Sequence, residues 1–165
     1  MNAARQVLVF QRLGGEFEFA NFNNMANTWG QNVIECAKEA VIVSAAGRVF
    51  ELFSRSTAAW PIKLEGPQDQ DLVVQAAWDL ERKSLVIDVL NYKGEGVEMA
   101  FDMSALGLLA REAGVAILHG SSLAARNSIV DPDAIRREDS HVPLRSHSEF
   151  RLAVPRYSVS HAVLH

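Results

Sequence analysis

The sequence predicts a mostly β protein, an antiparallel β-sandwich that follows a shorter α/β segment. Short alternating runs of apolar and polar residues, separated by turn residues, fill the chain after Pro67. Before Trp60 the apolar residues recur mainly at helical spacing. The chain is 48% hydrophobic and 22% charged, a composition that suffices for a packed core. Its 165 residues are too few for a large enzyme. We therefore divide the chain into residues 1–60 and residues 61–165.

The first segment starts with a short predicted helix. Val7 and Leu8 lead to Leu13, and the glycine pair Gly14-Gly15 provides a C-terminal cap. An alternating run at residues 16–20 then predicts a β-strand, and an asparagine-rich turn comes after it.

Two further helices are predicted before residue 60. One runs from Asn24 to Trp29, and the other from Ala45 to Arg55, where Val49 and Leu52 lie on one face. Helix, strand and helix in this order form an α/β unit, whose strand needs parallel neighbours on both sides. This chain supplies no such neighbours.

The second segment is predicted to form six short strands. Turn residues at 81–83, 93–96 and 155–156 separate several of them. The polar stretch 128–148, which contains Pro132 and Pro143, predicts a long ordered loop. The predicted strands are residues 73–78, 85–90, 97–101, 115–118, 150–154 and 158–164.

Composition and charge exclude several classes of protein. The net charge of −4 and the scattered arginines argue against a nucleic-acid partner, since phosphate binding needs a basic face. The single cysteine cannot form an internal disulfide. The first residues are too polar for a signal peptide, and no run approaches the ~18 apolar residues of a membrane helix. We expect no membrane association and a cytoplasmic location.

Glu16 and Glu18 are the most prominent carboxylate pair. Alternate residues of a strand point to the same side, roughly 6.5 to 7 Å apart, and glycoside hydrolysis uses two carboxylates. However, carboxylates at the start of a strand more often face solvent or pair with arginine. We therefore predict no catalytic residue in this chain.

No metal or cofactor site is predicted either. The five histidines lack metal-ligand spacing, and Gly94-Glu95-Gly96 is interpreted as a hairpin turn because a dinucleotide fingerprint would open a helix. His119 is interpreted as a strand end that runs into a loop. Cys36 is interpreted as a small packed residue, since no partner for a nucleophile is visible.

Four aromatic residues leave two interpretations open. Trp60, Trp78, Tyr92 and Tyr157 would form a sugar-stacking platform if they shared one surface, but sandwich cores use the same residue types. Trp78 continues the alternation of Val74 and Ala76, so we predict that it belongs to the core.

Five segments in chain order point to one family. In chain order they are FANFNNMAN at 19–27, AAGRVFELF at 45–53, Leu90-Asn91, NSIVDPD at 127–133 and PRYSV at 155–159. Together they resemble the C-terminal third of glycoside hydrolase family 51, the α-L-arabinofuranosidases. The first resembles the last barrel strand and its loop, the second the closing barrel helix, and the others the C-terminal sandwich.

The resemblance implies a jelly-roll-like sandwich preceded by a remnant of a (β/α)8 barrel. The family is implied to release terminal arabinofuranose with retention, using a glutamate nucleophile and a glutamate acid/base that both lie upstream of this chain. A complete barrel needs about 250 residues, so the chain would hold only its end. The glutamine that contacts the sugar in the last barrel loop aligns with Asn24, one methylene shorter, so Asn24 is the implied substrate-binding residue.

Two functions follow as hypotheses. The chain is the C-terminal region of an arabinofuranosidase-like enzyme, supporting the catalytic barrel without being catalytic alone, or it is a stand-alone sandwich that binds carbohydrate or a protein. The first predicts contact with an arabinofuranosyl oligosaccharide only within a complete barrel. Because the strand at 16–20 lacks neighbours, we also expect self-association through residues 1–55, or association with the missing barrel part.

Overall fold

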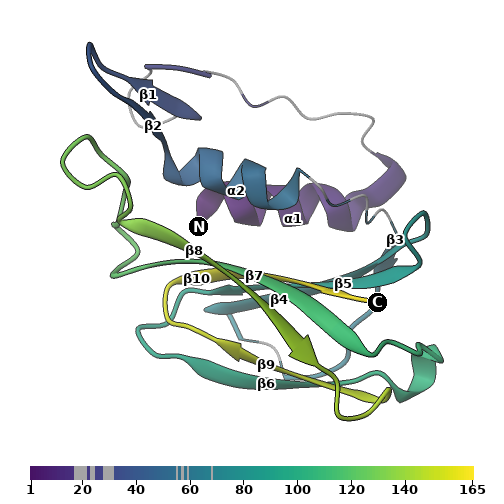
Figure 1. The fold of residues 1–165 in the computed structure, drawn as a ribbon. Coiled ribbons are helices and arrows are strands. Elements are labelled where there is room, and N and C mark those ends of the chain that lie inside the picture. The colour runs from purple at the N-terminus through teal and green to yellow at the C-terminus, as the bar shows by residue number, and fades with distance from the viewer. Residues whose placement is uncertain are drawn as a thin grey trace.

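The computed structural model describes residues 1–16, 22, 25–27, 32–54, 56, 58, 60–67 and 69–165. Two helices lie side by side on one face of a six-stranded sheet, and a two-stranded sheet covers the other face (Figure 1). A small ribbon of two further strands extends beyond the helices. The prediction of a mostly β protein with antiparallel sheets is confirmed.

Both long helices end or begin at residues that cap them. Helix α1 covers Asn2–Leu13, and the backbone N–H of Gly14, at φ 53°, closes its last turn on the carbonyls of Phe10 and Gln11. Helix α2 covers Ala45–Phe53, and the Ser44 hydroxyl accepts a hydrogen bond from the Gly47 N–H at 3.1 Å. The predicted end of α1 is thus confirmed, although the helix starts five residues before Val7.

The six-stranded sheet is antiparallel throughout, in the order β3-β4-β5-β10-β7-β8. The two-stranded sheet pairs β6 with β9, and the ribbon pairs β1 with β2. All six predicted strands are present, and β7 is five residues longer than predicted, whereas each of the others gains at most two. The bounds are β1 Ile34–Cys36, β2 Val41–Val43, β3 Trp60–Ile62, β4 Leu72–Asp79, β5 Ser84–Asn91, β6 Val97–Asp102, β7 Glu112–Gly120, β8 Ile135–Pro143, β9 Glu149–Val154 and β10 Ser158–Leu164, with short 3-10 turns η1 at Gly14–Glu16 and η2 at Ser104–Leu106.

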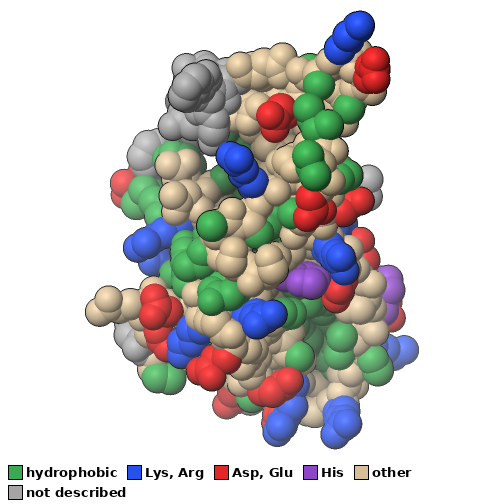
Figure 2. All heavy atoms as spheres, turned by 90° about the vertical axis from the view of Figure 1, so that its left-hand side faces the viewer, with side chains coloured by type: hydrophobic (Ala, Val, Ile, Leu, Met, Phe, Trp, Pro, Cys, Tyr) green, Lys and Arg blue, Asp and Glu red, His purple; other side chains and the backbone are tan. Residues whose placement is uncertain are grey.

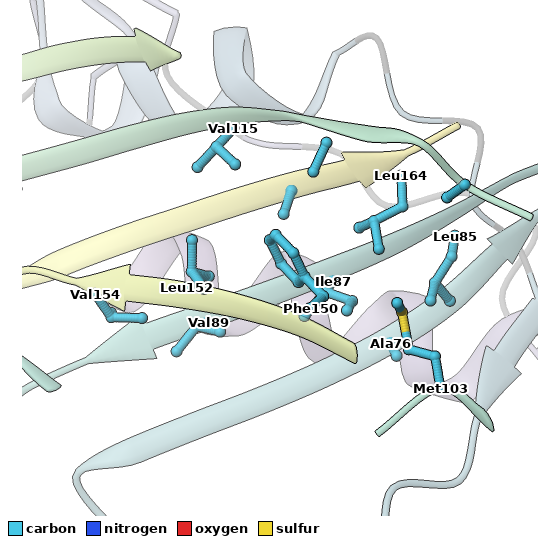
Figure 3. Close-up of a cluster of buried hydrophobic side chains, with 13 residues drawn as sticks. Ala76, Leu85, Ile87, Val89, Met103, Val115, Phe150, Leu152, Val154 and Leu164 are labelled. Atoms are coloured by element: carbon cyan, nitrogen blue, oxygen red, sulfur yellow. The ribbon is translucent and has the colours of Figure 1, made fainter. Parts of the chain in front are cut away.

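The main hydrophobic core lies between the two sheets. Figure 3 shows Phe150, Leu152 and Val154 of β9 pointing toward β5, where Ile87 and Val89 face them. Every second residue of β9 is buried, which is the pattern of a strand with one face on a core.

A second core joins the helices to the opposite face of the six-stranded sheet. Ala4 and Leu8 of α1 are almost fully buried, and they share a cluster with Val49, Leu52 and Phe53 of α2. From the sheet, this cluster includes Leu90, Leu118 and Val159. Because both faces are covered, every residue of β5 is buried, and so is all of β10 except Val163. Polar residues in these two strands therefore need partners inside the protein.

Several local predictions were wrong. The stretch predicted as a long loop contains β8, an edge strand whose side chains are mostly exposed. Met25 to Asn27 are not helical, since Ala26 forms an isolated parallel bridge with Ile34 and Asn27 has φ 50°. Glu16 belongs to η1 rather than to a strand, and the rest of the strand predicted at 16–20 lies outside the described residues.

The glycine pair between β5 and β6 also differs from its prediction. The turn exists, but β5 pairs with β4 and β10, whereas β6 pairs with β9. Gly94 and Gly96 therefore lie in a crossover between two sheets and not in a hairpin. Among the helices that the structure describes, none has the length and apolar character to cross a membrane.

Candidate functional site

A groove of about 270 Å³ lies where the C-terminal end of α2 passes over the six-stranded sheet. Its floor is formed by small or apolar residues of three adjacent strands, including Val86, Gly114, Ala116 and Val163. Polar and charged side chains from α2, β8, β10 and the β4–β5 turn surround this floor. The groove thus combines an apolar base with a polar rim.

One polar residue that lines the groove is His161 of β10. Its Nδ1 lies 2.6 Å from Oδ1 of Asp88, which is directly opposite on β5. Asp88 is 2% exposed and His161 is 8% exposed, and the ring of Phe53 contacts the imidazole edge-on at 5.5 Å between centroids. Asp88 therefore fixes the orientation of the ring and favours the proton on Nδ1.

The rim toward β8 is held by Arg137. Its Nε and Nη2 atoms both contact the Asp139 carboxylate at 2.9 to 3.0 Å, and Nη1 lies 3.8 Å from Glu51 of α2. The hydrogen bonds to Asp139, with a smaller contribution from the charge of Glu51, raise the pKa of Arg137 above its ordinary value. This guanidinium also ties the edge strand to the helix layer.

The opposite rim is formed at the β4–β5 turn. Oδ1 of the buried Asp79 accepts a hydrogen bond from the Arg82 N–H at 3.0 Å, and Nε of Arg82 lies 3.7 Å from Oδ2. On the face shown in Figure 2, acidic and basic side chains are interspersed and no extended area carries one sign. Each guanidinium on the two rims of the groove therefore has at least one carboxylate neighbour.

Within the described residues, no group of three or more histidine, cysteine or acidic side chains is placed to hold a metal ion. His119 lies in β7 one residue before its end, as predicted, and its Nε2 contacts Glu138 at 2.9 Å. It belongs to the sheet surface and does not line the groove.

The sequence-predicted sugar contact, Asn24, lies outside the described residues, as do Glu18 and Asn21. Glu16 is exposed. Asn27 has a local structural role, because its Oδ1 accepts a hydrogen bond from the Cys36 N–H at 2.6 Å. Cys36 is exposed, so its prediction as a packed residue was wrong.

The four aromatic residues do not form one platform. Trp60 and Trp78 are directly opposite each other on β3 and β4. Tyr92 follows the end of β5 that pairs with Leu72, and Leu72 is about 20 Å from Trp78 along β4. Tyr157 lies near Tyr92, since its N–H donates to the Lys93 carbonyl. Trp78 is half-buried and packs against the main core, as predicted, while Trp60 is 61% exposed.

Sequence reasoning missed the Asp88–His161 pair. A signal was present, since each residue is an ionisable group within a mainly apolar strand, and a charged group inside a buried strand requires a partner. The sequence gave no indication which residue that partner would be.

The fold is similar to those of solved α-L-arabinofuranosidases. It matches the arabinose complex of the Thermotoga maritima enzyme with a TM-score of 0.80, at 19% identity over 98% of this chain and 36% of that chain. The family 51 enzyme from Thermotoga petrophila RKU-1 gives 0.79 at 18% identity, covering 99% of this chain and 37% of that one. The family 51 enzyme from Xanthomonas axonopodis pv. citri matches with a TM-score of 0.79 at 17% identity, covering 99% of this chain and 34% of that one.

This chain therefore spans roughly a third of the length of these three structures. Comparisons of the sequence with protein-family models and with curated proteins give no match. What is shared is the fold of one part of these enzymes, and the coverage is consistent with a C-terminal part.

Proposed function

We propose that this chain is the C-terminal region of an α-L-arabinofuranosidase-like glycoside hydrolase, where it supports the catalytic barrel and is not catalytic alone. In this proposal the segment before residue 60 is the end of the barrel and residues 61–165 are the supporting sandwich. An arabinofuranosyl oligosaccharide would be bound only by the complete barrel, with Asn24 as one contact, in a cytoplasmic enzyme.

The observation that carries the proposal is the docking of α1 and α2 on the six-stranded sheet. Leu8, Leu52 and Phe53 insert between the helices and the sheet and are at most 7% exposed. A sheet face covered in this way holds the helices at a fixed position, because a close-packed core resists displacement. Any barrel segment built on these helices would be held at the same position.

A buried polar contact secures the same arrangement. Asn127, in the β7–β8 connection, donates from Nδ2 to the Val43 carbonyl at the end of β2, and its Oδ1 accepts from the Ile135 N–H that begins β8. The asparagine is 4% exposed. It therefore joins the sheet to the segment that leads directly into α2.

Another face of α1 supports a partner beyond the helices. Val9 is 45% exposed and Leu13 is 39% exposed, although both are large apolar residues. Neighbouring apolar side chains on an exposed helix are typical of a surface that another protein segment covers. The missing part of the barrel is the occupant we propose, and a second copy of this chain is the alternative.

The activity of the isolated chain tests the first half of the proposal. We expect no hydrolysis of an aryl α-L-arabinofuranoside above the buffer rate, because the implied catalytic glutamates are upstream. Turnover that is abolished by Glu16→Gln or Glu18→Gln would refute the supporting role.

Co-expression with the polypeptide encoded immediately upstream tests the second half. We expect the two polypeptides to co-purify and to hydrolyse the arabinofuranoside together. Val9→Asp combined with Leu13→Asp should prevent co-purification, whereas Leu109→Asp, at a residue that is 77% exposed next to η2, should not. An upstream frame without a barrel sequence, or co-purification unaffected by the α1 double variant, would contradict the proposal. Light scattering of the isolated chain separates a homodimer from a monomer.

A further inference from the structure

We propose that the groove between α2 and the six-stranded sheet binds a single neutral sugar unit, held by the imidazole of His161. This site belongs to this chain alone and does not depend on the supporting role proposed above.

The size and the floor of the groove suit one sugar ring. Its volume of about 270 Å³ is near the lower limit for small-molecule sites, which suits a pentose or hexose unit better than a longer chain. A Cβ atom added at Gly114 would meet only Cε1 of His141, at 4.0 Å. Gly114 thus leaves open space above an apolar floor, where the C–H face of a sugar ring would pack.

The charges of the groove disfavour an anionic ligand. Arg137 is engaged by Asp139 and Glu51, and Arg82 lies beside Asp79. Among the described residues of the rim, two guanidinium groups thus face three carboxylates, and neither guanidinium is left without a carboxylate neighbour. A ligand with hydroxyl groups suits such a rim, because a hydroxyl both donates and accepts hydrogen bonds.

His161 supplies an oriented hydrogen-bonding group to the groove. Nδ1 is engaged by Asp88, which does not line the groove, so Nε2 is on the ring edge away from that carboxylate. Among the residues described by the structure, none makes a hydrogen bond to Nε2. An oriented imidazole beside an apolar floor provides a directional contact for a sugar hydroxyl.

Saturation-transfer NMR on the full chain tests this site with L-arabinose, D-xylose and D-glucose as probes. We expect saturation of the ring protons of at least one sugar, with a millimolar dissociation constant. Gly114→Leu fills the floor and should abolish the signal, and His161→Gln should weaken binding about tenfold through loss of an oriented acceptor. Gly114→Ala is the matched control for folding, because its Cβ has room. It should still bind the sugar, with affinity reduced by less than tenfold.

Trp60→Ala is the matched control for the aromatic alternative, because Trp60 is exposed and does not line the groove. Loss of the signal in Trp60→Ala but not in Gly114→Leu would place the sugar on the tryptophan and overturn the proposal. The absence of saturation for all three sugars would overturn it as well. Neither result bears on co-purification with a barrel segment, so the two proposals fail independently.

Discussion

Replacing Asn127 by alanine tests whether one side chain holds the sheet against the helix segment. The substitution removes the hydrogen bond of Nδ2 to the Val43 carbonyl, 2.9 Å long, and the bond of the Ile135 N–H to Oδ1, 2.7 Å long. Alanine offers neither group. Two backbone polar groups that lie near a buried side chain then lose their partners.

The expected loss follows from those two groups. An unsatisfied buried donor or acceptor costs about 1 to 3 kcal/mol, so Asn127→Ala should reduce the free energy of unfolding by roughly 2 to 4 kcal/mol if solvent reaches the site in part. For a chain of this length each kcal/mol corresponds to about 2 to 4 °C, which predicts a melting temperature lowered by roughly 4 to 16 °C. Asn127→Asp should fall in the same range, since it keeps the acceptor for Ile135 but places a carboxylate against the Val43 carbonyl oxygen.

Urea denaturation followed by circular dichroism measures this loss, and hydrogen exchange locates it. The amide of Ile135 should exchange faster in Asn127→Ala, whereas Asn127→Asp keeps its acceptor and should protect it better. Asn2→Ala is the matched control, because Asn2 is exposed at the first position of α1, so it should change stability by less than about 0.5 kcal/mol. If Asn127→Ala behaves like Asn2→Ala, the asparagine does not fix the helix segment, and the main polar support for the proposed function is lost.

Three further outcomes are expected from the fold. Trp78→Ala should destabilise the protein by about 3 kcal/mol, the lower limit for a buried tryptophan, whereas the exposed Trp60→Ala should cost less than about 1 kcal/mol by the same denaturation assay. Phe150→Ala, at 1% exposure in the main core, should cost about 3 to 5 kcal/mol, and a smaller loss would mean that the two sheets are not packed as described. The hydrogen bond from Lys93 holds the pKa of Asp69 below its ordinary value, so its stabilising effect is present above pH 3.8 and is lost as the pH falls through the folded pKa. A carboxyl NMR titration should show the midpoint of Asp69 move upward in Lys93→Met, and an unchanged midpoint would refute this cause.

The sequence predicted those strands whose two faces differ in polarity or whose residues are mostly apolar. Residues of β9 alternate strictly between buried and exposed, and β5 is a mostly apolar run bounded by turns. The sequence did not predict β8, because it is an edge strand with charged side chains on both faces, such as Arg136, Arg137 and Glu138. Such a composition protects an edge from aggregation and removes the hydrophobic signal on which strand prediction depends.

The candidate site was less predictable than the fold, for a reason of distance in the chain. Asp88 and His161 are 73 residues apart and meet only because β5 and β10 are neighbours in the sheet. No local pattern encodes that pairing. Asp79 of β4 and His161 of β10 were visible in the sequence, but their meeting at one groove depends on strand order.

The segments that resemble the arabinofuranosidases contain side chains that fix the path of the chain between elements. Asn91, fully buried at the end of β5, donates to the carbonyls of Glu95 and Pro155 and accepts from the Lys93 N–H. Ser158 donates to the Pro155 carbonyl in the turn before β10. Together with Asn127, these residues satisfy backbone groups where the chain leaves one sheet or enters another. Apolar core residues can be exchanged when total volume is kept, but a side chain that bonds two separate backbone segments has few substitutes.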